Sequence, residues 1–223
     1  GADLRLVPAK PYKDPDNYVK YSGRLAEEMK NVDNKGVIWT NQFDNTANYK
    51  GHYETTGKEI WEQTEGKIDG FICASGTGGT IAGVSNALKE KNKNIKIYLS
   101  DPKGSCLYNY IKNKEFKSEG SSITEGIGSS RSTKNFDNAL IDDAYSIDDT
   151  TALKILFNLI EQEGLSLGTS SGINVAGAIQ LAKELGPNKT IVTILCDKSD
   201  RYQGKLFNKK FLMDKNLPYP RWL

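Results

Sequence analysis

Apolar residues along this chain gather in short runs that alternate with longer amphipathic segments. Short apolar or β-branched runs predict strands, and segments in which apolar residues recur about every third or fourth position predict helices. On this pattern we expect strands over residues 4–7, 36–43, 68–73, 96–100, 144–147 and 190–196. Helices are expected over residues 18–30, 53–65, 81–91, 151–163 and 174–185.

Alternation of strands with helices predicts an α/β fold: a three-layer arrangement with a parallel sheet and helices on both faces. Ligands of such sheets bind at the carboxyl ends of the strands. Two turns rich in small residues, 76–80 and 168–172, each stand just before an expected helix. They are therefore the first places to look for a binding site.

The turn Gly76-Thr77-Gly78-Gly79-Thr80 has the composition of an anion cradle. Glycines let the backbone approach an anion closely, and the free N–H groups of a helix start point at it. The dinucleotide fingerprint fails because Ile81 stands where its last glycine belongs, and the triphosphate loop fails because Val84 replaces its lysine. The turn is thus predicted to hold a single phosphate group; the alternative is a glycine-rich connection without a ligand.

Composition limits the partners and the compartment. The 223 residues carry a net charge of +2, which gives no electrostatic reason to expect nucleic acid or a membrane as a partner. Three widely spaced cysteines and one histidine argue against a disulfide framework and a zinc site. Cys73 and Cys196 are expected to be buried, and no apolar run is long enough to span a membrane. A cytoplasmic, reducing location fits these features.

Several segments, taken in order, resemble one known family. The segments are Asn41-Gln42-Phe43, the run from His52 to Trp61, Gly76 to Thr80, Glu125-Gly126-Ile127-Gly128, Gly168-Thr169-Ser170-Ser171-Gly172 and Cys196-Asp197. They are similar to cysteine synthase, or O-acetylserine sulfhydrylase, of the pyridoxal-phosphate fold type II (tryptophan synthase β) group. This resemblance runs along the whole chain. It implies a β-replacement in which O-acetylserine and sulfide give cysteine and acetate.

The resemblance also implies roles for individual residues. Gly76, Thr77, Gly78, Gly79 and Thr80 would cradle the 5′-phosphate of pyridoxal phosphate. Ser170 would meet the pyridine nitrogen, although a serine at that place could equally be a helix N-cap. Gln42 would bind the carboxylate of the amino-acid substrate, and Gly126 would bring the backbone close to the bound substrate. His52 would lie near the site entrance, but a surface histidine at a helix start is the plainer interpretation.

Two of the family's segments are missing from the sequence. The chain has no Ser-x-Lys-Asp/Glu-Arg motif, which carries the family's Schiff-base lysine, and no Thr-Ser-Gly-Asn-Thr-Gly segment. The stretch Lys198-Ser199-Asp200-Arg201 corresponds instead to a later part of the family's pattern, so we assign no catalytic residue. We expect this chain to be the C-terminal portion of a longer protein. Residues 1–43 would be the remnant of a smaller domain, and residues 44–223 the large cofactor-binding domain.

Three alternatives stay open at this point. A cystathionine β-synthase or another β-replacing relative shares the same motifs, and a chain without the lysine could be catalytically inert. A nucleotide-binding dehydrogenase domain is disfavoured by Ile81. The resemblance further implies a homodimer in the intact protein, and the C-terminal tail is expected to dock on its own domain through Trp222.

Overall fold

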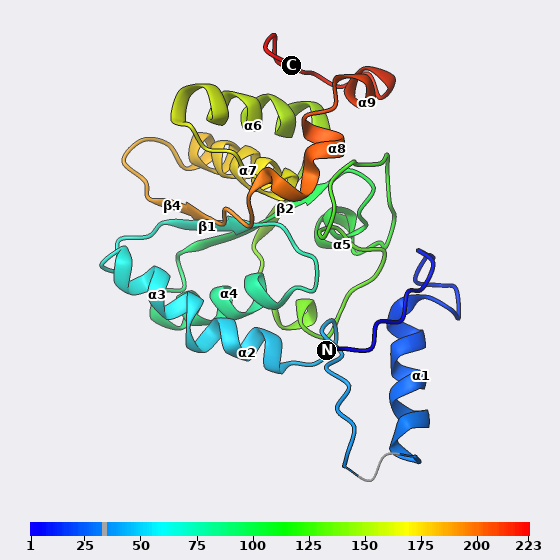
Figure 1. Cartoon of the computed structure of the whole chain (residues 1–223). Coiled ribbons are helices and arrows are strands. Elements are labelled where there is room, and N and C mark those ends of the chain that lie inside the picture. The colour runs from blue at the N-terminus through cyan, green and yellow to red at the C-terminus, as the bar shows by residue number, and fades with distance from the viewer. Residues whose placement is uncertain (33–34) are drawn as a thin grey trace.

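A parallel sheet lies between two layers of helices in the computed structural model, which describes residues 1–32 and 35–223 (Figure 1). The sheet has the strand order β3-β2-β1-β4, and every neighbouring pair is parallel. Its strands are β1 (Gly70–Cys73), β2 (Lys96–Pro102), β3 (Asp143–Ile147) and β4 (Ile191–Thr193). The α/β fold expected from the sequence is confirmed.

Alternation along the central strands sends side chains to both faces of the sheet. Phe71 and Cys73 of β1 pack in one cluster with residues of α4 (Gly79–Lys91), while Ile72 packs with Leu181 of α7 (Thr169–Leu185) on the other face. All four residues of β1 are buried, as a strand covered on both faces must be. Its carboxyl end is therefore fixed between α4 and α7.

The remaining helices complete the two layers. The helices α2 (Ala47–Glu54) and α3 (Thr56–Gln63) pack on α4, and α6 (Asp149–Glu163) packs on α7. A Cβ at Gly83 of α4 would clash with the backbone of α2, so the glycine is what allows these helices to approach so closely. The shorter helices are α5 (Leu107–Asn113), η1 (Phe136–Asn138), η2 (Ser199–Tyr202), α8 (Gln203–Leu206) and α9 (Lys209–Asp214).

The N-terminal region departs from the expected pattern. Helix α1 (Tyr18–Lys30) forms as predicted, with the Asn17 side chain accepting a hydrogen bond from the Val19 N–H at its start. The strands expected over residues 4–7 and 36–43 do not form: both stretches are irregular. A strand needs a neighbour for its backbone groups, and no strand among residues 1–32 and 35–223 pairs with either stretch. Leu6 and Ile38 are consequently 86% and 91% exposed.

Several other boundaries differ from the sequence-based expectation. In place of the helix expected over 53–65, the chain forms α2, which begins earlier at Ala47, and α3. The two are separated at Thr55, whose φ of −118° and ψ of −81° are not helical. Helix α7 begins at Thr169, five residues early, because its first turn consists of small residues that carry no amphipathic signal. Strand β4 ends at Thr193, so Cys196 lies beyond the sheet and is exposed; the prediction that it is buried was wrong, whereas Cys73 is buried as expected.

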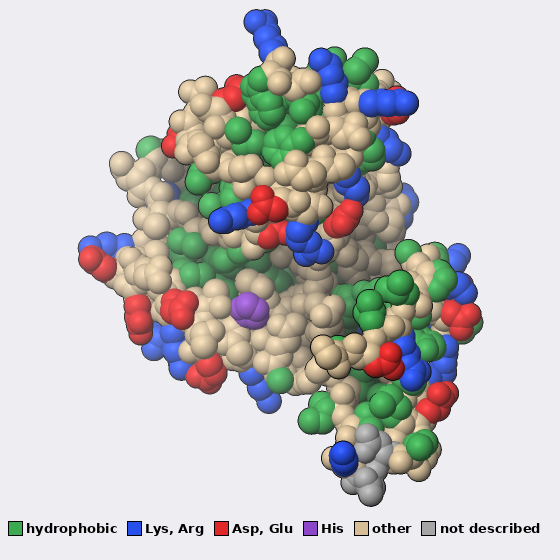
Figure 2. All heavy atoms as spheres, viewed as in Figure 1, with side chains coloured by type: hydrophobic (Ala, Val, Ile, Leu, Met, Phe, Trp, Pro, Cys, Tyr) green, Lys and Arg blue, Asp and Glu red, His purple; other side chains and the backbone are tan. Residues whose placement is uncertain are grey.

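The C-terminal tail folds back onto the domain. The Trp222 indole N–H donates to the Glu161 carboxylate at 2.8 Å, and its ring meets Phe157 edge-on. Docking through Trp222 is thus confirmed. The face seen in Figure 2 carries basic and acidic side chains interspersed over the main body. Within the described residues, no helix has both the length and the apolar character that crossing a bilayer requires.

Candidate functional site

The glycine-rich turn connects the carboxyl end of β1 to the start of α4. Gly78 has φ +87°, in the left-handed region that glycine enters without strain, and it reverses the chain directly into the helix. The Ala82 N–H donates to the Gly78 carbonyl at 3.0 Å, so the N–H groups before it belong to the open first turn of α4. An anion placed there meets these donors and the positive end of the helix dipole.

Each glycine of the turn occupies a place where a side chain would not fit. A Cβ on Gly76 would collide with the Gly126 carbonyl, and one on Gly79 would collide with the Asn48 side chain. A Cβ on Gly78 would lie 2.6 Å from the Phe136 backbone nitrogen. The cradle is therefore built from bare backbone packed against three other segments, and its backbone N–H donors suit a phosphate group.

Two hydroxyls of the turn are held by neighbouring side chains. Thr77 Oγ1 accepts a hydrogen bond from Asn48 Nδ2 at 2.9 Å, and Thr80 Oγ1 lies 3.3 Å from His52 Nε2. Burial lowers the pKa of His52, which favours the neutral ring near pH 7. His52 is therefore half-buried, in the last turn of α2 and next to the cradle, and it is not the open surface histidine at a helix start that the simpler interpretation predicts.

Ser170 lies in the first turn of α7, at the same end of the sheet. It is buried, and its neighbour Thr169 has a buried hydroxyl without a hydrogen-bond partner among the described residues. Ser75, directly before the glycine turn, has a second such hydroxyl. Buried hydroxyls are normally hydrogen-bonded, so these two remain available to bond a polar ligand at the carboxyl edge of the sheet.

Asn174 joins these two regions. Its Oδ1 accepts from the Ala74 N–H at 2.7 Å and its Nδ2 donates to the Ile194 carbonyl at 2.7 Å. One buried side chain thus ties α7 to the ends of β1 and β4, at the edge of the sheet from which the glycine turn begins. Sequence reasoning missed this residue, although a lone asparagine inside an apolar helix is a recognisable signal.

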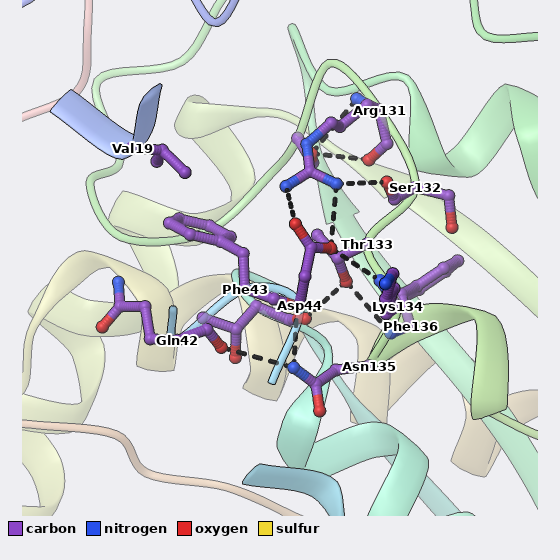
Figure 3. Close-up of polar contacts among 12 residues, drawn as sticks. Val19, Gln42, Phe43, Asp44, Arg131, Ser132, Thr133, Lys134, Asn135 and Phe136 are labelled. Carbon is purple, nitrogen blue, oxygen red and sulfur yellow. Dashed lines mark hydrogen bonds and ion pairs between the residues drawn. The ribbon is translucent and has the colours of Figure 1, made fainter. Parts of the chain in front are cut away.

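Gln42 reaches the cradle through its backbone. Its carbonyl accepts from Asn48 Nδ2 at 3.2 Å and from Asn135 Nδ2 at 3.3 Å, while Asn48 also holds Thr77. In Figure 3 the Gln42 side chain points away from the Asp44–Arg131 ion pair. The preceding residue, Asn41, has φ +44°, and its buried Oδ1 has no hydrogen-bond partner in the described part of the chain. Asn is one of the few residues that accept this conformation readily.

The residues singled out from the sequence are therefore neighbours in the fold. Gly126, with φ +78°, presents its carbonyl to Gly76, and the Gly128 N–H donates to the Ser75 carbonyl at 2.8 Å. No group of three or more His, Cys, Asp or Glu side chains in the described residues could hold a metal ion. The arrangement offers backbone N–H groups that can donate to a phosphate, together with hydroxyls and side-chain amides, and these suit an anionic organic ligand.

Known proteins have sequences similar to this one. The family "Pyridoxal-phosphate dependent enzyme" matches residues 1–197. "Cysteine synthase 1" of Neurospora crassa is 46% identical over 222 residues, which cover 97% of this chain and 58% of that protein. "Cysteine synthase" of Dictyostelium discoideum is 39% identical with the same coverage, and "Cystathionine beta-synthase" of Apis mellifera is 34% identical, with 42% of its length covered. This chain thus spans less than two thirds of the length of these relatives.

Proposed function

Because this chain belongs to the pyridoxal-phosphate dependent enzyme family, we propose that it binds pyridoxal phosphate and serves the synthesis of cysteine from O-acetylserine and sulfide by β-replacement. The observation that carries this proposal is the glycine cradle between β1 and α4, in which Gly76, Gly78 and Gly79 have no room for a side chain of their own. Two further relatives named cysteine synthase, with 45% and 40% identity, support the choice of reaction.

Residues of this chain would hold the cofactor at its two ends. The backbone N–H groups and hydroxyls of Gly76 to Thr80 would bind the phosphate, and Ser170 would face the pyridine nitrogen. When bound, pyridoxal phosphate supplies the electron sink for chemistry at the amino acid. A serine hydroxyl is neutral and both donates and accepts, so it would not fix a proton on the ring nitrogen as a carboxylate would.

The substrate would lie over the cradle, between Gln42 and Gly126. The Gln42 amide would donate to the substrate carboxylate, and the bare backbone of Gly126 would permit close approach. We assign no proton-transferring residue in this chain, since the sequence contains no Ser-x-Lys-Asp/Glu-Arg motif.

Replacement of Gly76 by alanine tests the cradle. Gly76→Ala should abolish binding of pyridoxal phosphate, because the new methyl group would collide with the Gly126 carbonyl. Gly204→Ala is the matched control, since a Cβ there would meet no described residue within 4 Å. Binding is measured by equilibrium dialysis of pyridoxal phosphate, with inorganic phosphate as competitor, and cysteine formation from O-acetylserine and sulfide is assayed in parallel.

Equal binding by both variants would refute the assignment of the cradle. Binding that inorganic phosphate does not weaken would refute the phosphate as the anchoring group. Binding without cysteine formation would leave the cofactor site standing and remove the proposed reaction from this chain.

The proposal extends to three further features. They are a homodimeric assembly, a cytoplasmic location, and a division of the chain at residue 43 into two domains. The assembly is tested by sedimentation equilibrium of the purified chain. A relative in Saccharomyces cerevisiae is named "Putative mitochondrial cysteine synthase", so the compartment has to be determined by imaging.

A further inference from the structure

We propose that Arg131 is a positioning residue for the amino-acid substrate, because its ion pair with Asp44 fixes the segment that carries Gln42 beside the glycine cradle. This inference rests on the proposed function, since it takes Gln42 as the group that meets the substrate carboxylate. It concerns a residue outside every motif that the resemblance supplied.

The ion pair between Arg131 and Asp44 is bidentate. Arg131 Nη1 donates to Asp44 Oδ1 at 3.1 Å and Nη2 donates to Oδ2 at 2.8 Å, across 87 positions of sequence (Figure 3). The side chains are 24% and 19% exposed, so solvent screens the pair less than a surface pair. Two parallel hydrogen bonds fix orientation as well as distance.

Arg131 also stacks on the segments that flank the site. Its guanidinium lies 4.4 Å from the ring centre of Tyr12 and 6.0 Å from that of Phe43, the residue directly after Gln42. A cation near the face of an aromatic ring is attracted to it. The planar guanidinium of arginine can also stack on the ring, which a lysine ammonium cannot do. One side chain thus holds the N-terminal loop, Phe43 and Asp44 together.

The residues that follow Arg131 hold the same segment at further points. The Lys134 N–H donates to Asp44 Oδ1 at 2.9 Å, and Asn135 Nδ2 donates to the Phe43 carbonyl at 2.7 Å. Asn135 Oδ1 accepts from the Tyr49 N–H at 3.2 Å. Residues 131–136, which we term the clamp segment, therefore hold the chain at Phe43 and Asp44, directly after Gln42, and near the start of α2 (Figure 3).

The clamp segment reaches the cofactor cradle as well. The Thr133 hydroxyl donates to the Thr77 carbonyl at 2.6 Å, and the Phe136 backbone closes against Gly78. The substrate-binding segment and the phosphate-binding turn are thus attached to one support. Loss of the Arg131 contacts would loosen the attachment of Gln42, while Thr133 and Phe136 still hold the cradle.

Replacement of Arg131 separates these two attachments. In Arg131→Gln, hydrogen–deuterium exchange of peptides covering residues 42–49 should rise about tenfold, because the amides there lose their anchored neighbours. With pyridoxal phosphate bound, affinity for L-serine, used as a probe carboxylate, should fall about tenfold, whereas affinity for pyridoxal phosphate should change less than about twofold. Arg131→Lys, which keeps the charge but loses the fork, should recover part of the serine affinity.

The matched control is Asp142→Asn. Asp142 binds both the Lys89 ammonium and the Ile97 N–H, as Asp44 binds Arg131 and the Lys134 N–H, but Asp142 lies between β2 and β3 beside the end of α4. Asp142→Asn should raise exchange around residue 97 and leave serine affinity unchanged. Serine affinity that falls equally in both variants would show a general structural effect and would overturn the inference.

The remaining outcomes distinguish this inference from the proposed function. If the unsubstituted chain binds both ligands and Arg131→Gln changes neither serine affinity nor exchange over residues 42–49, the inference alone is wrong. If the unsubstituted chain binds pyridoxal phosphate but not serine, the inference is wrong and the cofactor site stands. If it binds no pyridoxal phosphate, the proposed function is wrong and the inference falls with it.

Discussion

Asp101 stands out among the single residues because it is a fully buried carboxyl with an incomplete set of partners. It lies near the end of β2; its Oδ2 accepts from the Tyr108 N–H at 2.8 Å, but its Oδ1 has no partner among the described residues. Burial raises the pKa of Asp101 to about 6, because the charged form loses its hydration. Near pH 7 the protein therefore carries a poorly compensated buried charge.

Stability should consequently depend on the protonation of Asp101. The pKa in the folded state lies above the unfolded value, so the stabilisation is fully present below about pH 4 and is lost as pH rises through about 6. An upward shift of this size corresponds to about 3 kcal/mol at pH 7, as an order of magnitude. Asp101→Asn should flatten the fall in the free energy of unfolding between pH 5 and 7.5, measured by urea titration. Identical slopes for the two proteins would contradict this expectation.

Single residues of the site differ in how far the sequence reveals them. Gly76 to Thr80 could be predicted because a phosphate cradle is built from consecutive residues, so its pattern is local. The Asp44–Arg131 pair and Asn135 could not, because they act on residues more than 80 positions away, and nothing near them in sequence marks the partner. The structure supplies what local pattern lacks, namely which distant backbone groups need a donor.

At the scale of elements, α7 is the piece that sets the site most directly. The Asn174 side chain supplies hydrogen bonds to two backbone groups just beyond the ends of β1 and β4. It also donates to the Cys196 sulfur at 3.4 Å. Near the other end of α7, the Glu184 carboxylate accepts hydrogen bonds from the Tyr98 and Tyr145 hydroxyls, so polar bonds hold the helix towards both of its ends.

Asn174→Ala should destabilise the protein by about 3 kcal/mol, because the partly buried Ala74 N–H and Ile194 carbonyl would both lose their hydrogen-bond partner. Gln180→Ala, on an exposed position of the same helix, is the control and should change stability by less than about 0.5 kcal/mol. Urea unfolding followed by tryptophan fluorescence measures both. Equal midpoints for the two variants would show that Asn174 does not hold the helix start.

The elements that sequence predicted best are those that carry their own signals. Helix α1 has its Asn17 cap and ends where predicted, and the strands at the core follow continuous apolar runs. The stretches 4–7 and 36–43 also contain apolar residues, but no described strand pairs with them and they are irregular. Strand formation is a property of pairs, and sequence pattern describes one member of the pair at a time.

The whole molecule arranges its layers so that the tail and the site are separate. Helix α6 covers the outer side of α7, and the C-terminal residues lie on α6, on the far side from the layer formed by α2, α3 and α4 (Figure 1). Alternation of elements predicted the parallel sheet, but the order β3-β2-β1-β4 depends on crossovers that no local pattern specifies. That order places the glycine turn after a central strand, beside α7.

This separation predicts that the tail stabilises the fold without affecting the ligand site. Trp222→Ala removes the bond to Glu161 and the ring contacts with Phe157 and Phe207, and it should lower the free energy of unfolding by about 1–2 kcal/mol. Trp222→Phe, which keeps a ring but not the N–H donor, should lose less. In Trp222→Ala, hydrogen exchange over residues 206–223 should rise while affinity for pyridoxal phosphate stays the same. A fall in that affinity would mean that docking of the tail on α6 is energetically coupled to the cradle through α7. It would contradict the separation of tail and ligand site.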